Sequence, residues 1–341
     1  MTRKTNSSKV IREVRNEKKL THFELGVETM VDMIDIDLFI TAVFTLVDDF
    51  FKGDPLPHKP GPNCKLTASE AITLLLFSQW GRFRSERDFY RFAYRKLRSA
   101  FPDLPSRPQL NRQWRALHDQ VCVFSSYLAD VLDAGEAPYE ALDTGPVVTR
   151  NAKRRGGGWL VGEADIGYSN RLGWYEGLKL LLAVTPQGVI TGFGLSPASA
   201  KEQPMAETFF YLRVYPDPRV ASIGKTSCHV YYPVDKGFEG YENRERWKED
   251  YGAYVICPPK SNSRSPWPKE LRRWVASIRQ IVETVFDKLL YTFRLDRERP
   301  HLLGGIRTRL AAKVALHNFC IWFNRQSRRL NLAFADLLGW S

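Results

Sequence analysis

The chain has 341 residues, of which 43% are hydrophobic and 26% are charged, a balance typical of a folded globular protein. No apolar run approaches the roughly 18 residues needed to cross a bilayer, so the sequence predicts no membrane span. Together, 50 Lys and Arg against 38 Asp and Glu give a net charge of +12. This excess predicts polyanionic partners, above all nucleic acid. The alternative is a soluble protein that happens to be basic.

The N-terminal residues are basic and lack the apolar core of a secretory signal. We therefore expect a cytoplasmic protein, associated with the nucleoid when it is bound to DNA. The five cysteines are dispersed and form no CxxC pair, which predicts reduced thiols that mostly serve packing. The histidines form no HExxH pattern, so the sequence argues against a zinc site.

Composition along the chain predicts three regions. Residues 1–60 form a basic arm followed by an apolar, helix-like stretch, and the Pro- and Gly-rich residues 51–63 indicate a linker. Residues 61–134 have helical periodicity. Residues 135–341 alternate between strand and helix patterns and form the predicted catalytic domain.

The middle region, 61–134, contains the pattern of three helices. Thr67 and Glu70 fit a capping box, Ser85 begins a second helix, and Ser106 begins a third that we expect to continue to about residue 132. Three short helices with a basic third one resemble a helix-turn-helix module; a helical packing domain with a solvated charged face is the alternative. The candidate DNA contacts near the start of the third helix are Arg107, Arg112 and Arg115, with Gln109 and Asn111 beside them.

Residues 135–341 show the order β-β-β-α-β-α-β-α, which is that of an RNase H-like domain. This predicts an α/β fold in which a mixed sheet, flanked by helices, combines antiparallel hairpin strands with right-handed parallel crossovers. A hairpin is expected around the turn at 186–188, the segment 162–170 reads as a turn, and a final helix covers 307–325.

Three acidic residues stand out in this region. Asp143 lies in a predicted strand, Asp235 ends another, and Glu283 lies on an amphipathic helix whose apolar neighbours place it close to the buried side. Ionised carboxylates in such settings cost free energy unless a positive group binds them, because burial and mutual repulsion both disfavour ionisation. In the predicted topology the first and fourth strands are neighbours, so the two aspartates can approach each other. The arrangement suits Mg²⁺, which prefers hard oxygen ligands.

Each acid also has a simpler interpretation. Asp143 and Asp235 can be ordinary strand-end or turn residues. Glu283 can belong to a surface ladder with Arg279 and Asp287, spaced i, i+4, i+8, in which each pair contributes only about 0.2–0.5 kcal/mol. Rival acids for the metal site are Glu163 and Asp165.

Basic and aromatic residues near the acids are candidate DNA contacts. Lys236 follows Asp235 directly. A Gly-rich loop after the first strand can grip phosphates or be a plain solvated loop; its basic residues are Arg150, Lys153, Arg154 and Arg155. Three aromatic residues can stack on an unpaired base or fill the core: Trp159, Trp174 and Tyr175.

Several sequence pieces resemble the DDE transposases of prokaryotic insertion sequences. They are LDTGPV around Asp143, GWYEGLKLLLAVTPQG across the hairpin, VDKGF at Asp235, and RQIVETVFDKL at Glu283 followed by RTRLAAKVALHN. The resemblance covers most of the chain and is densest between residues 141 and 324. Asp-Lys-Gly-Phe together with Arg-x3-Glu is a fairly specific combination, whereas Asp-Lys-Gly alone is weak.

The resemblance implies an RNase H-like catalytic domain with two Mg²⁺ or Mn²⁺ ions held by Asp143, Asp235 and Glu283. It implies hydrolysis at the terminal inverted repeats of a transposon, followed by attack of the released 3′-hydroxyl on target DNA, by a homodimer that pairs two ends. Arg279 would contact a DNA phosphate or steady Glu283. Alternatives are a metal-dependent nuclease of the same fold without strand transfer, and a non-catalytic DNA-binding protein derived from a transposase.

The chain departs from the family at two positions. Related transposases often have Tyr three residues before the Arg and Lys seven residues after the Glu, where this chain has Ala276 and Leu290. Lys288 is a candidate to replace that lysine in part.

Overall fold

The computed structural model describes residues 33–55, 64–150, 160–217, 220–224, 230–238, 240–259 and 266–340. They fall into two units, one from 1–117 together with 323–341 and the other from 118–322. The domain bounds predicted from the sequence (1–60, 61–134 and 135–341) stay a prediction. Within the described residues, no helix has the length and apolar character needed to cross a membrane.

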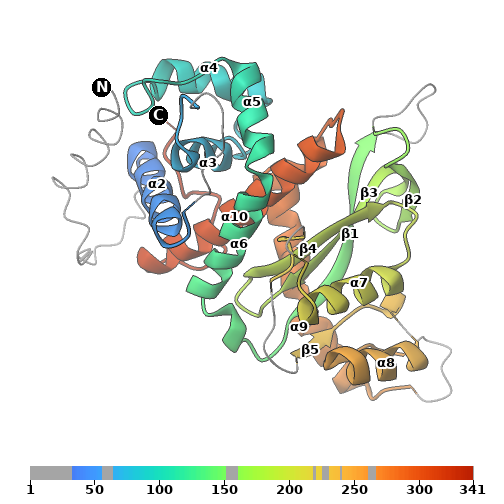
Figure 1. Cartoon of the computed structure of the whole chain (residues 1–341). Coiled ribbons are helices and arrows are strands. Elements are labelled where there is room, and N and C mark those ends of the chain that lie inside the picture. Colours follow the sequence, from blue (N-terminus) through green and yellow to red (C-terminus); the bar gives the residue numbers. More distant parts are fainter. Residues whose placement is uncertain are drawn as a thin grey trace. The chain divides into compact units, whose positions relative to one another are not determined.

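The first unit is helical (Figure 1). Its helices are α2 (Ile36–Gly53), α3 (Ala68–Phe77), α4 (Glu86–Lys96) and α5 (Arg107–Ala116), joined by the last turn of α10 (Leu303–Gln326). The predicted capping box exists: the Thr67 hydroxyl accepts the Glu70 N–H at 3.2 Å, and the Glu70 carboxylate accepts the Thr67 N–H at 2.8 Å. Aromatic rings fill the core, with Phe77 at its centre and Phe89 and Trp340 around it.

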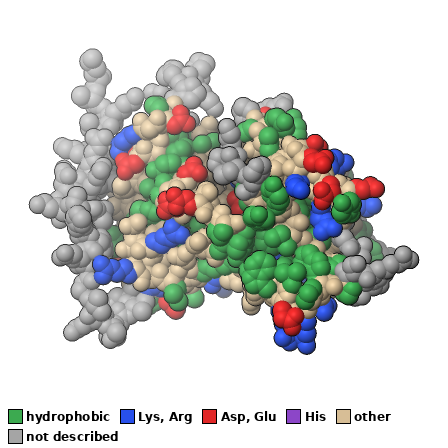
Figure 2. All heavy atoms as spheres, turned by 90° about the horizontal axis from the view of Figure 1, so that it is seen from below, with side chains coloured by type: hydrophobic (Ala, Val, Ile, Leu, Met, Phe, Trp, Pro, Cys, Tyr) green, Lys and Arg blue, Asp and Glu red, His purple; other side chains and the backbone are tan. Residues whose placement is uncertain are grey.

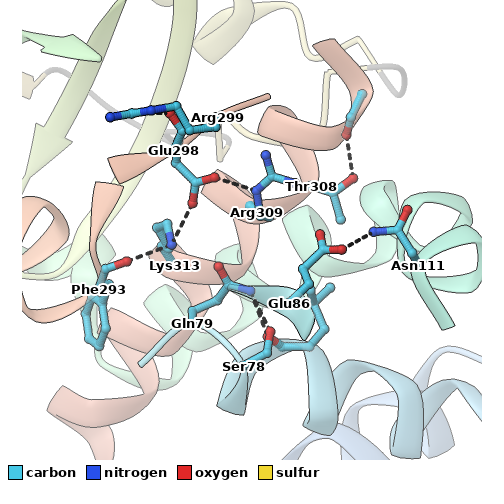
Figure 3. A network of polar contacts seen from close by, with 12 residues as sticks. Ser78, Gln79, Glu86, Asn111, Phe293, Glu298, Arg299, Thr308, Arg309 and Lys313 are labelled. Atoms are coloured by element: carbon cyan, nitrogen blue, oxygen red, sulfur yellow. Dashed lines mark hydrogen bonds and ion pairs between the residues drawn. The ribbon is translucent and has the colours of Figure 1, made fainter. Parts of the chain in front are cut away.

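Helix α5 is anchored by its buried side and leaves its basic side exposed. Trp114 is buried and donates its indole N–H to the Ala71 carbonyl at 2.9 Å. Asn111 donates to Glu86 at 2.8 Å (Figure 3). The predicted third helix is wrong in its length: it ends at Ala116, and α6 (His118–Val131) follows as a separate helix. The sequence has neither Gly nor Pro at this break, so no local signal marks it.

The second unit is built on a twisted sheet. Strand β3 (Gly173–Val184) pairs antiparallel with β1 (Ala141–Arg150) along one edge. Along the other edge it pairs with β2 (Asp165–Ser169) and then with β4 (Ile190–Pro197). The prediction of a turn over residues 162–170 is therefore wrong, since part of this segment is strand β2. The reason is length: Gly173–Gly177 extends beyond the partners of β4, and β2 satisfies its backbone groups.

Strands β5 (Val230–Pro233) and β6 (Ala253–Ile256) form a parallel pair connected by α8 (Tyr241–Tyr251). A parallel bridge between Tyr139 and Tyr231 joins this pair to the start of β1. The Glu140 N–H strengthens the junction by donating to the Tyr231 carbonyl at 3.0 Å. Pro233 is the last residue of β5, where its missing N–H is tolerated, as expected from the sequence.

Two helices cover opposite faces of this sheet, as alternation along β1 shows. Thr144 contacts α7 (Glu202–Val214), whereas Asp143 contacts α9 (Lys269–Asp287). Phe286 of α9 lies so close to Gly145 that a Cβ there would come within 2.6 Å of its ring, so β1 needs glycine at this position. Helix α10 (Leu303–Gln326) confirms the predicted final helix.

A buried polar cluster ties α10 to the segment after α9 (Figure 3). The Glu298 carboxylate contacts Arg309 at 2.6 Å and Lys313 at 3.0 Å, and Lys313 also donates to the Phe293 carbonyl at 2.7 Å. We call Glu298, Arg309 and Lys313 the α10 cluster. Elsewhere hydrophobic side chains reach the surface (Figure 2). Tyr211 of α7, for example, is half exposed.

Candidate active site

Strand β1 places Asp143 firmly. The strand pairs with β3 at Asp143 and Leu182, and the neighbouring Leu142 and Leu182 side chains are fully buried. The Thr144 N–H donates to the Asp143 carboxylate at 2.7 Å. Asp143 itself is 18% exposed at its side chain, so its carboxylate reaches the surface from a mostly apolar strand.

Asp235 lies two residues beyond the end of β5. The Val234 N–H donates to the Ile256 carbonyl at 3.1 Å, and the buried Cys257 thiol donates to the Asp235 carbonyl at 3.3 Å. A short 3-10 turn, Lys236–Phe238, then carries the chain away. The Asp235 side chain is 56% exposed, so it is oriented by its backbone and remains open to a ligand.

Arg279 of α9 spans the two aspartates. One guanidinium nitrogen lies 2.9 Å from the Asp143 carboxylate, and the other lies 3.6 Å from that of Asp235. Asp143 and Asp235, distant in sequence, are thus brought to the same point at the sheet, as the predicted topology requires. We call these three residues the acid site.

The acid site holds two carboxylates and one guanidinium. Burial, above all, and the nearby Asp235 raise the pKa of Asp143, while Arg279 and the Thr144 N–H act to lower it, and the net result is a pKa of about 6. Arg279 therefore does not fully offset burial and repulsion. The negative charge of the two carboxylates is therefore not fully balanced, and a further positive group at the site would be favourable.

Two hard oxygen donors with an unmet need for positive charge fit a divalent cation such as Mg²⁺. Across the described residues, however, no group of three or more His, Cys, Asp or Glu side chains forms a ready metal cage. Asp143 and Asp235 therefore supply the donors that the structure brings together, and Glu283 does not join them in this arrangement.

Glu283 lies on α9 one turn after Arg279, on the side of the helix that faces β1 between Arg279 and Phe286. Its side chain is exposed, so the prediction that it lies close to the buried side is wrong. The buried stripe is taken by Val282 and Val285, and Glu283 is rotated by about 100° from Val282 around the helix. Its role as a metal ligand stays a prediction.

Sequence reasoning missed a further carboxylate beside the acid site. Glu202, the first residue of α7, accepts from Lys179 at 2.9 Å and from the Thr144 hydroxyl at 3.4 Å. A Cβ at Gly237 would lie 3.3 Å from the Glu202 side chain, so glycine lets the turn after Asp235 approach this closely. The available signal was Lys179, a charged residue inside the apolar run of β3, which requires an acidic partner.

The rival acids have other surroundings. Asp165 accepts hydrogen bonds from the backbone N–H of Ser199, at 2.8 Å, and from its hydroxyl, which ties β2 to the end of β4. Glu163 is exposed before β2. Within the part of the chain that the structure describes, neither acid contacts the acid site, so both have a structural setting of their own.

The predicted DNA contacts have different exposures. Lys236 is exposed next to Asp235, and Lys288 is half-buried in the π-helical turn Lys288–Thr292 after α9. Arg150 is buried at the end of β1, with its guanidinium 3.5 Å from Glu176, so little of it is left for a phosphate. Exposed side chains on α5 in the first unit are those of Arg107, Arg112 and Arg115. Outside the described residues lie Lys153, Arg154 and Arg155, together with Trp159.

Comparison with known protein families assigns the chain to a family. The family described as transposase DDE domain matches residues 143–319, just over half of the chain. The match begins at Asp143 and contains Asp235, Arg279 and Glu283. Comparison with curated proteins and with solved structures gives no match. The chain therefore belongs to the transposase DDE domain family.

Proposed function

We propose that the protein is a DNA transposase whose RNase H-like domain cleaves transposon ends and joins them to target DNA. The observation that carries the proposal is the meeting of Asp143 and Asp235 at the junction of β1 and β5, beside the helix that carries Glu283. The strand order β4-β3-β1, continued through the bridge to β5 and β6, supports the RNase H-like assignment.

In this proposal Asp143, Asp235 and Glu283 hold two Mg²⁺ or Mn²⁺ ions. Bound there, such ions activate the attacking oxygen and stabilise the leaving oxygen of an in-line displacement at phosphorus. Glu283 is one helical turn from Arg279, so a rotation of its side chain brings it toward the aspartates. Arg279 leaves the carboxylates for a DNA phosphate, and Lys236, exposed beside Asp235, binds another.

The chain's own residues also keep the site in shape. Glu202, held by Lys179 and Thr144, supports the turn at Gly237 and thereby the direction of Asp235. Water or a DNA 3′-hydroxyl is the nucleophile in turn: water frees the 3′-hydroxyl at the transposon end, and that hydroxyl then attacks a target phosphodiester. We propose that the terminal inverted repeats are bound as a pair by a homodimer, with the exposed arginines of α5 contributing DNA contacts.

The test is a joining assay with the full chain, labelled DNA carrying the transposon ends, a target plasmid and Mg²⁺ or Mn²⁺. We expect metal-dependent cleavage that leaves a 3′-hydroxyl, and a labelled end joined to the plasmid. Asp143→Ala and Glu283→Ala should each reduce cleavage by at least about 10³-fold while DNA affinity stays within about twofold. The matched control is Glu163→Ala, which removes an exposed acid away from the site.

The outcomes separate the alternatives. Cleavage without a joined product would assign the chain to the metal-dependent nucleases. DNA binding without any metal-dependent cleavage in the parent protein would leave a non-catalytic DNA-binding protein. Full activity of Glu283→Ala would remove Glu283 from the metal site and leave the two aspartates.

A further inference from the structure

The hairpin of β2 and β3 exposes an apolar face. Its register pairs Tyr168 with Trp174, and the neighbouring pair is Gly167 with Tyr175. Tyr175 is 3% exposed and lies on the inner face, where Gly167 touches the Ala198 backbone. On the outer face the side chains of Tyr168 and Trp174 are 57% and 69% exposed. A two-stranded ribbon normally places polar residues on its solvent face, so these rings lack an explanation in the fold.

The two rings form an ordered pair. Their centroids are 5.5 Å apart and their planes meet at 66°, in an edge-to-face arrangement. Most of the Trp174 surface consequently stays free for a third ring. Ile166 and Leu172, both about half exposed, widen the apolar surface around the pair. We call Tyr168, Trp174, Ile166 and Leu172 the hairpin patch.

The tip of the hairpin is fixed to α9. Arg171 lies over the Tyr291 ring at 5.4 Å and contacts Asp287 at 3.4 Å. Asp287 ends the helix in which Arg279 spans the two aspartates. Trp174 lies eight residues before Leu182, which pairs with Asp143, so about 26 Å of strand separates the hairpin patch from the acid site. One nucleotide of a DNA strand rises about 3.4 Å, so the hairpin patch lies roughly eight nucleotides from the acid site.

We propose that the hairpin patch binds an unpaired nucleobase of the DNA substrate, stacked on Trp174, roughly eight nucleotides from the phosphodiester at the acid site. Any base has a π-face, and stacking on an aromatic side chain contributes about 1–3 kcal/mol without regard to sequence. A second protein fits less well, because a stable protein interface takes about 20–30 residues a side and the patch offers four side chains. The position relative to the scissile bond rests on the proposed function; the stacking itself does not.

The test measures binding of DNA by the full chain, without divalent ions, so that catalysis plays no part. The probes are a single-stranded dT oligomer, a blunt duplex of the same length, and duplexes with a single-stranded tail carrying 2-aminopurine at successive positions. Trp174→Ala should weaken binding of the single strand by about 5- to 100-fold and that of the blunt duplex by less than twofold. Trp174→Phe should retain most of the affinity.

Two further variants keep the result interpretable. Tyr168→Ala should weaken binding of the single-stranded oligomer less than Trp174→Ala does. Tyr211→Ala removes another half-exposed tyrosine of the same unit, on α7, and should change nothing. Quenching of 2-aminopurine should peak roughly eight nucleotides from the end that is cleaved, and Trp174→Ala should abolish that peak.

Several results would overturn the proposal. Equal losses for single strand and duplex would make the patch a general DNA contact. Unchanged DNA binding together with loss of self-association in sedimentation would assign the patch to a second copy of the chain. If Trp174-dependent binding of single strands survives while the joining assay fails, the proposed transposition fails and the stacking site stands.

Discussion

Two clusters of carboxylates and cations in the unit 118–322 balance their charges in opposite ways. In the α10 cluster one acid, Glu298, lies between Arg309 and Lys313. In the acid site two acids share one guanidinium, that of Arg279. Burial alone would raise the pKa of Glu298, but Lys313 and Arg309 more than offset burial and the pKa is lowered. The pKa of Asp143 is instead raised to about 6.

This difference separates a structural cluster from a functional one. The α10 cluster is complete in itself: its carboxylate is 10% exposed and each oxygen has a cation. The acid site keeps Asp235 more than half exposed and is short of positive charge. Such an arrangement does not stabilise the fold. We therefore interpret the excess of negative charge in the acid site as a capacity to bind cations.

The largest effect is expected from breaking the complete cluster. Glu298→Gln removes the charge between Arg309 and the deeply buried Lys313, and an uncompensated buried charge costs about 3–5 kcal/mol. Urea unfolding at neutral pH should show a loss of that size in the free energy of unfolding. Glu163→Gln, an exposed acid, should stay within about 0.5 kcal/mol. A loss below about 1 kcal/mol for Glu298→Gln would mean that the cluster contributes no more than a surface pair.

The opposite sign is expected at the acid site. The folded pKa of Asp143, about 6, lies above its ordinary value of 3.8, so the folded chain binds this proton more tightly than the unfolded chain does. Ionisation of Asp143 therefore costs stability as pH rises through about 6, up to roughly 3 kcal/mol. In EDTA at pH 8, Asp143→Asn should be more stable than the parent by roughly 1–3 kcal/mol, and the difference should vanish below about pH 4.

The same pH series extends the comparison to Glu298. Its pKa is lowered from 4.5, so its contribution is present above that pH and is lost as pH falls through the lowered value. The stability deficit of Glu298→Gln relative to the parent should thus shrink on acidification. The stability gain of Asp143→Asn should shrink as well, so both differences approach zero at low pH, one from below and the other from above. An Asp143→Asn protein that is less stable than the parent at pH 8 would contradict the charge balance described for the acid site.

An element of the fold could be predicted from the sequence when nearby residues carried a signal for it. The capping box at Thr67, the hairpin of β3 and β4 and the pairing of Asp143 with Asp235 were predictable, because caps, turns and strand order leave marks in the sequence. Strand β2 was not predictable, because its own residues fit a turn as well as a strand. It forms by pairing with the part of β3 that extends beyond β4. The break before α6 likewise has no local cause.

Side-chain surroundings were harder to predict than elements. Glu283 was placed on the right helix but too close to its buried stripe, because apolar neighbours on both flanks do not fix the rotation within about 100°. Glu202 went unnoticed because its contact with Lys179 joins α7 to β3 across the fold. The spanning of both aspartates by Arg279 also depends on distances that no spacing rule gives.

The smallest effect, and the sharpest test of the comparison, concerns Arg279. Its guanidinium occupies the space between Asp143 and Asp235 and so competes in charge with a metal ion. Arg279→Ala should bind Mn²⁺ about tenfold more tightly in calorimetric titrations without DNA, corresponding to about 1.4 kcal/mol. Arg279→Lys should lie between the two, and Arg272→Ala, which removes an exposed charge near the start of α9, should behave like the parent. Equal or weaker Mn²⁺ binding by Arg279→Ala would mean that Arg279 shapes the site for metal, and the acid site would then resemble the α10 cluster in depending on its own cation.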